Sequence, residues 1–227
     1  MTPELNKLDE KLIELSKTLF EIKSNLDLYK IISLNAPEIN EMGRGKIFFG
    51  KVQRMSLDSY ILGICKVFEE KKKHEINSLP SILKTAKCCK PKNEQPLIDF
   101  INKHRDFLGQ RKEDCGNPSI TDIEKIYKEF YQKYLIKDDR LKKVRDKIIT
   151  HSEYIEDIAR PKDIQSYDLM EKFLFFSIDM QSAINRAYLG VHSHPIKNDE
   201  RVFSSTRAVL EKFGVSNVKT KLDDEQC

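Results

Sequence analysis

The sequence has no tryptophan, only 8 glycines in 227 residues, and no apolar run that approaches the length of a membrane span. Charged residues make up 33% of the chain and hydrophobic residues 39%. The first residues are charged, which is unlike the apolar segment of a secretion signal. These absences predict a helix-rich protein without membrane association.

The cysteines are few and lack any ligand or disulfide pattern. Their number is odd, two of them are adjacent, and no CxxC occurs: Cys65, Cys88, Cys89, Cys115 and Cys227. The sequence therefore predicts neither a disulfide framework nor a zinc site, and a reducing, cytoplasmic location is the natural interpretation.

The net charge of +4 is too small to indicate a nucleic-acid partner by itself. Within residues 133–147, however, the basic residues outnumber the acidic Asp138, Asp139 and Asp146. The basic residues are Lys133, Lys137, Arg140, Lys142, Lys143, Arg145 and Lys147. A solvated helix face is the commoner explanation of such a run, and attraction to phosphate is the more specific one.

Helical spacing of apolar residues organises most of the chain. It predicts helices over residues 3–33, 46–70, 78–87, 96–112, 164–189 and 203–213, and one that begins at a Thr121–Glu124 capping box and runs to His151. Asn35-Ala36-Pro37 ends the first helix, and Ser78 is the expected N-cap of the third. The first helix carries a heptad seam, for which core packing is favoured over a role in dimerisation.

This pattern predicts an all-α antiparallel bundle of long helices. We expect one domain over residues 1–190, with a short-helix insertion near residues 78–112. Residues 191–227 are expected to form a loop, a short helix and a tail that is loose from Val215 onward.

The stretch 141–153, LKKVRDKIITHSE, combines a core-facing pattern with three polar residues that suit RNA chemistry. Cleaving RNA through its own 2′-hydroxyl requires one proton to be removed, one to be donated, and charge on the phosphate to be stabilised. His151 suits either proton transfer near neutral pH. Arg145 presents a planar fork to phosphate oxygens. An Arg and a His near the end of a helix also suit the helix dipole, which is the structural alternative.

Arg145, Asp146 and His151 resemble the R-x4–6-H signature of the HEPN superfamily, and RDKIITHSE is closest to AbiU-type abortive-infection proteins. The resemblance spans roughly residues 5–190 and includes KVFE at 66–69 and SLPSILK at 78–84. It implies a HEPN-type helical bundle, usually dimeric, that often acts as a metal-independent RNA endonuclease without cofactor. It also implies that Asp146 orients either Arg145 or His151.

Helix geometry limits how this motif can work. On one straight helix Arg145 and His151 would lie about 120° apart around the axis and roughly 9 Å apart along it. Either the helix loosens near Thr150, or a second subunit completes the site. The resemblance implies the second solution, a homodimer.

The leading hypothesis is an endoribonuclease of bacterial antiphage or toxin–antitoxin defence, with RNA contacts from Lys142, Lys143 and Lys147. The alternative is a catalytically inactive HEPN module that binds nucleic acid or a partner protein. Acidic residues follow the motif, and they argue either against free access of RNA or for regulation by an antitoxin or another defence protein: Glu153, Glu156 and Asp157.

Two other histidine groups are better explained without chemistry. His104-Arg105-Asp106 lacks the motif's spacing, so we expect a structural role. His192 and His194 have no evident third ligand, which favours a loop over a metal site.

Overall fold

The computed structural model describes residues 1–42, 45–70, 77–108, 119–136, 167–191 and 200–219. Every regular element in these ranges is helical, which confirms the all-α prediction. The elements are α1 (Pro3–Leu34), α2 (Ala36–Glu41), α3 (Lys46–Phe68), α4 (Leu79–Ala86), α5 (Gln95–Lys103), the 3-10 helix η1 (Arg105–Leu108), α6 (Ile120–Tyr131), the π-helix η2 (Gln132–Ile136), α8 (Tyr167–Tyr188) and α9 (Arg201–Lys212).

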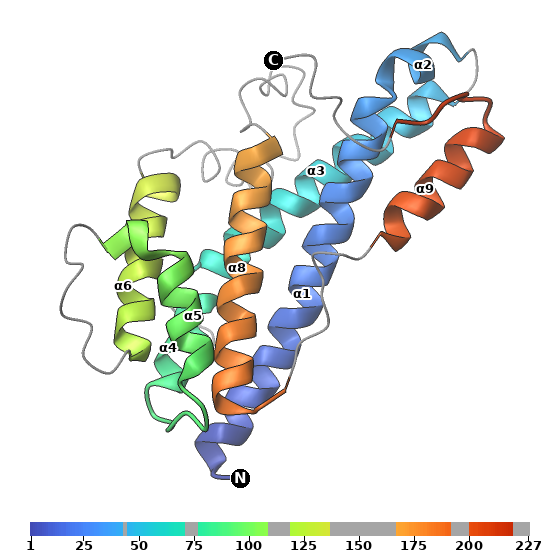
Figure 1. Cartoon of the computed structure of the whole chain (residues 1–227). Coiled ribbons are helices and arrows are strands. Elements are labelled where there is room, and N and C mark those ends of the chain that lie inside the picture. Colours follow the sequence, from blue (N-terminus) through green and yellow to red (C-terminus); the bar gives the residue numbers. More distant parts are fainter. Residues whose placement is uncertain (43–44, 71–76, 109–118, 137–166, 192–199, 220–227) are drawn as a thin grey trace.

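Helix α1 runs the length of the molecule and packs against both of its hydrophobic clusters (Figure 1). The Leu5 amide donates to Thr2 Oγ1 at 3.3 Å, and proline occupies the first turn, where its missing N–H costs nothing. The heptad seam is buried from Leu8 to Tyr29, whereas Ile13 stays half exposed. The expectation that this seam packs in a core is confirmed.

Helix α3 crosses close to α1 at Gly63. A Cβ on Gly63 would lie 2.5 Å from Ile22 Cγ1, so only glycine permits this approach of the two helices. The apolar face of the C-terminal half of α3 is buried from Leu57 to Phe68, whereas Ile47, Phe48 and Met55 in its first half are exposed.

The main core lies where α3, α4, α5, α6 and α8 pack around α1 from Leu8 to Tyr29. Helices α6 and α8 run in opposite directions, so the C-terminal end of α6 and the N-terminal end of α8 lie at the same end of the bundle (Figure 1). The antiparallel arrangement expected from the sequence is therefore present. Residues of α4 and α5, within the expected insertion, belong to this same core.

A second, smaller cluster joins the far halves of α1 and α3 to α2, α9 and the chain after α9. Val215 and Val218 are buried in it, and the Lys219 amide donates to Asn35 Oδ1 at 2.8 Å. The prediction of a loose tail from Val215 onward is wrong for residues 215–219, because their apolar side chains cover the end of α1. Residues 220–227 lie outside the described part.

Two local predictions need correction, and a third is confirmed in position only. The sequence favours a polar loop or a frayed turn over residues 38–45, whereas residues 36–41 form the short helix α2 directly after the break at Asn35. The helix expected over 96–112 ends at Lys103, and the 3-10 helix η1 follows. Ser78 occupies the N-cap position of α4 as predicted, but its buried Oγ has no hydrogen-bond partner in the described part of the chain.

Candidate functional site

The predicted catalytic residues Arg145, Asp146 and His151 lie outside the described residues, as do Lys142, Lys143 and Lys147. The same holds for the acidic stretch after the motif and for His192 and His194. What the structure describes is the frame on both sides: α6 and η2 lead into residues 137–166, and α8 leads out of them.

The start of α6 is fixed by a capping box that begins at Ser119, two residues before the predicted Thr121. Ser119 is the N-cap, and its backbone N–H donates to Asp122 Oδ2 at 3.0 Å. Burial by itself would raise the pKa of Asp122. Hydrogen bonds from Ser119 and Lys125 have the larger opposite effect, so the pKa of Asp122 lies below its ordinary value. The predicted Thr121–Glu124 pair is wrong, because Glu124 instead binds Lys87 of the α4 C-cap and Lys128 of the next turn.

Aromatic side chains hold the far end of α6 against α8. The rings of Phe130 and Phe176 stack with centroids 3.8 Å apart, and Phe130 also meets Phe173 at 5.6 Å. Beneath them, Phe68 stacks on Tyr127 and Phe130 at 5.9 Å each. The Tyr127 hydroxyl donates to the Phe68 carbonyl at 3.2 Å, and burial raises its pKa. The chain that enters the motif thus leaves from a fixed point.

The α6 helix continues into the π-helix η2, an uncommon element that often accompanies functional sites. Tyr134 on η2 contacts Phe130 at 5.0 Å and Phe107 of η1 at 6.1 Å. The sequence predicts an uninterrupted α-helix here. The π-helix was missed because it adds only about one residue to a turn, which hardly changes the spacing of apolar residues.

The start of α8 is held equally firmly. The Tyr60 hydroxyl donates to the Met170 carbonyl at 2.8 Å, and Lys30 forms an ion pair with Glu171 at 2.5 Å. Tyr167 packs against Tyr29 with ring centroids 5.7 Å apart, and burial raises the pKa of Tyr29 to about 12. Both ends of the undescribed segment are therefore attached to one core.

His104 has the structural role expected from the sequence. It caps α5 by donating its backbone N–H to the Phe100 carbonyl, and its ring lies 4.5 Å from that of Phe100. Its Nε2 lies 3.6 Å from Asp179 Oδ2, whereas Arg105 donates to Asn102 Oδ1 at 2.6 Å. His104 and Arg105 therefore have separate partners and do not form a shared catalytic pair.

Among the described residues, no group of three His, Cys, Asp or Glu side chains is placed to hold a metal ion. None of the helices in the described ranges is long and apolar enough to cross a membrane.

Comparison with known proteins gives one family. Residues 5–204 match the AbiU2 family of HEPN proteins, so the match runs past residue 190, where the resemblance was expected to end. No curated protein and no solved structure matches the chain. Because the matched residues cover most of the chain and the fold is all-α, the chain belongs to the AbiU2 family of HEPN proteins, a family related to abortive infection.

Proposed function

We propose that this protein is a metal-independent RNA endonuclease of bacterial antiphage or toxin–antitoxin defence. The observation that supports this most is the family match over residues 5–204, which contains Arg145, Asp146 and His151. The rigid frame of α6, η2 and α8 adds support, because a catalytic pair must be held within a fraction of an ångström of its working geometry.

In the proposed reaction the RNA 2′-hydroxyl attacks the adjacent phosphorus, and the bond from phosphorus to the 5′-oxygen breaks. His151 removes the 2′-hydroxyl proton or donates a proton to the leaving 5′-oxygen. Arg145 binds the phosphate oxygens while negative charge builds up on them, and Asp146 orients one of the two side chains. The products carry a 2′,3′-cyclic phosphate and a 5′-hydroxyl.

We also propose that the working unit is a two-fold dimer in which both motifs line one cleft. The separation of Arg145 and His151 around a straight helix, about 120°, motivates this arrangement. Mixing Arg145→Ala with His151→Ala protein should then restore part of the activity, since one site of the mixed dimer receives an intact residue from each chain. A monomer in sedimentation at micromolar concentration would contradict the arrangement.

The defence role implies a cytoplasmic protein that is held inactive by an antitoxin or another defence protein until it is needed. Expression of the wild type should therefore be toxic to bacteria, and toxicity should disappear in His151→Ala.

Single-turnover cleavage at saturating protein and binding titrations together test the proposed roles. His151→Ala should lose about 10²–10⁴-fold in cleavage rate with RNA affinity within a few-fold. Arg145→Lys should bind nearly normally and cleave poorly, because lysine keeps the charge and loses the fork. Replacing Lys142 and Lys143 with glutamine should weaken binding and leave the cleavage rate of bound RNA almost unchanged. RNA binding without His151-dependent cleavage would instead indicate an inactive HEPN module.

A further inference from the structure

Two lysines from different elements lie against one tyrosine ring at the end of the bundle that leads into the motif. Lys133 Nζ of η2 is 5.3 Å from the Tyr134 ring centroid, and Lys172 Nζ of α8 is 5.1 Å from it. Lys172 Nζ also lies 3.5 Å from the Tyr134 hydroxyl oxygen. Two ammonium groups thus lie beside one phenol ring, one of them next to its hydroxyl, where residues 137–166 leave and rejoin the core.

The tyrosine between them is held firmly, whereas both lysines are exposed. Phe130 contacts the Tyr134 ring at 5.0 Å, and Phe107 and Phe173 meet it edge-on at 6.1 and 6.3 Å. Lys133 also lies 5.6 Å from the Phe107 ring. The aromatic support fixes the position of the hydroxyl, so an arriving ligand would meet a preformed group.

Within the described residues, neither lysine of this cluster forms an ion pair with a carboxylate. Lys30, Lys87 and Lys103 each pair with a carboxylate from another element. In the same ranges no carboxylate pairs with Lys133 or Lys172, although both lie against one ring. Two nearby cations repel each other, and a bound anion between them would remove that repulsion.

We propose that Lys133, Lys172 and the Tyr134 hydroxyl form a phosphate-binding subsite for the RNA backbone. It takes a phosphodiester of the single-stranded RNA on which Arg145 and His151 act, and so rests on the proposed function. The lysines neutralise the phosphodiester charge, and the tyrosine hydroxyl donates to one of its oxygens. Because only backbone groups are bound, the subsite positions RNA without reading its sequence.

The test uses His151→Ala protein, in which binding is separated from cleavage. Binding of a fluorescein-labelled single-stranded RNA of about 15 nucleotides is followed by anisotropy over a range of salt concentrations. Adding Lys133→Gln and Lys172→Gln should weaken affinity about tenfold and lower the steepness of the salt dependence by about 0.7, the contribution of one single-strand phosphate. Tyr134→Phe should weaken affinity a few-fold and leave the salt dependence unchanged, since it removes a hydroxyl and keeps the ring and the charge.

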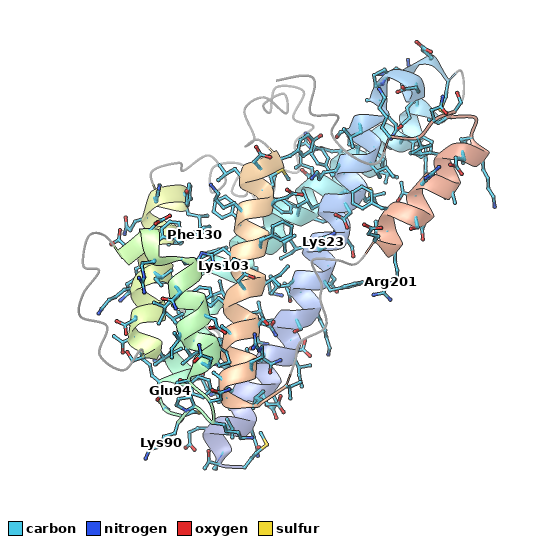
Figure 2. The ribbon with its side chains drawn as sticks, viewed as in Figure 1. Lys23, Lys90, Glu94, Lys103, Phe130 and Arg201 are labelled. Carbon is cyan, nitrogen blue, oxygen red and sulfur yellow. The ribbon has the colours of Figure 1, made fainter. Side chains whose placement is uncertain are left out.

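A matched control removes the same charge elsewhere. Lys84 and Lys90 are exposed, and Figure 2 shows Lys90 at the opposite end of the bundle from Phe130, the ring that supports Tyr134. Lys84→Gln with Lys90→Gln should leave affinity and salt dependence close to those of the parent. Unchanged thermal unfolding midpoints in all variants verify the fold.

Equal effects of the two double variants, or no effect of Lys133→Gln with Lys172→Gln, would overturn the subsite. So would unchanged RNA affinity with a weakened dimer in sedimentation, which would make the cluster a contact between proteins. These outcomes are independent of catalysis. Absence of His151-dependent cleavage with the binding effect intact would reject the endonuclease and retain the subsite.

Discussion

The two hydrophobic clusters lie at different places along α1 and are built from different side chains. In the main core, aromatic rings from α3, α5, η1, α6, η2 and α8 interlock around the stacked pair Phe130 and Phe176. The second cluster is mostly aliphatic, and exposed apolar residues border it, with Phe48 57% and Phe213 51% exposed. Regions with fewer buried contacts open more easily, so we expect the region that holds α6, η2 and the start of α8 to be the more stable of the two.

Truncating one ring in each cluster tests this difference most strongly. Phe130→Ala should lower the free energy of unfolding by about 3–5 kcal/mol, because the rings stacked around it leave little room to close the cavity. Phe49→Ala should cost less, since its neighbours Phe48 and Phe213 are half exposed and can move into the space. Urea unfolding measures both, and equal losses would remove the distinction between the clusters.

Gly50 and Gly63 lie on α3, the helix that contributes to both clusters, and replacing each by alanine tests how closely α3 packs at that position. Gly63→Ala should destabilise by about 1–3 kcal/mol, because its Cβ would lie 2.5 Å from buried Ile22 Cγ1. Gly50→Ala, the matched control, meets nothing within 4 Å and should stabilise by about 1 kcal/mol through helix propensity. A neutral Gly63→Ala variant would mean that α1 and α3 separate without cost.

The second cluster can be loosened by itself through Asn35. Its Nδ2 donates to the Ile31 carbonyl at 2.7 Å and to the Lys219 carbonyl at 2.9 Å. Asn35→Ala should cost about 1–3 kcal/mol, since the fully buried Asn35 amide is lost and the backbone groups of Ile31 and Lys219 lose their partner. Hydrogen exchange should rise in α9 and stay unchanged in α6 and the start of α8. Faster exchange throughout would show that the two clusters unfold as one unit.

Two carboxylates should respond to pH with opposite signs. Burial raises the pKa of Asp27, although Lys23 and Lys30 oppose this effect, whereas hydrogen bonding to Lys87 lowers the pKa of Glu124. The stability that protonated Asp27 contributes to the fold is therefore fully present below its ordinary pKa of 3.8. It is lost as the pH rises through the higher pKa that Asp27 has in the folded protein. The stability that ionised Glu124 contributes is fully present above its ordinary pKa of 4.5 and is lost as the pH falls through its lowered pKa in the folded protein.

Chemical unfolding at several pH values checks the sign of each effect. These changes in stability should be the smallest of the series. Relative to wild type, Asp27→Asn should gain stability as pH rises above 3.8. Glu124→Gln should be less stable above pH 4.5 and should approach wild type as pH falls. The same sign in both variants would contradict the assigned causes.

Helices whose apolar face is continuous could be predicted from the sequence, and features that depend on distant partners could not. The first helix was expected over 3–33 and runs over Pro3–Leu34, because its core-facing leucines repeat without a break. The burial of Val215 and Val218 depends on Asn35 and α9, which local spacing does not reveal. The capping partner of α6 was missed because Glu124 is taken by Lys87, far away in the sequence.

For the candidate site, the resemblance to the HEPN motif together with residue chemistry predicts Arg145, Asp146 and His151, and the family match spans all three positions. The positions of these side chains stay a prediction. Their support was not foreseen: Phe107, Tyr134 and Phe176 come from three elements, and only their packing shows that they form one cluster. A signal was available in the density of aromatic residues over 127–134, which exceeds that of a typical helix face.

The most direct test of the endonuclease is the chemistry of its products in the presence of EDTA. We expect purified wild-type protein to cut single-stranded RNA in chelator and to leave 2′,3′-cyclic phosphate and 5′-hydroxyl ends, with both products absent for His151→Ala. Cleavage that stops in EDTA and returns with magnesium or manganese, or that is the same in His151→Ala, would contradict a metal-independent mechanism built on Arg145 and His151.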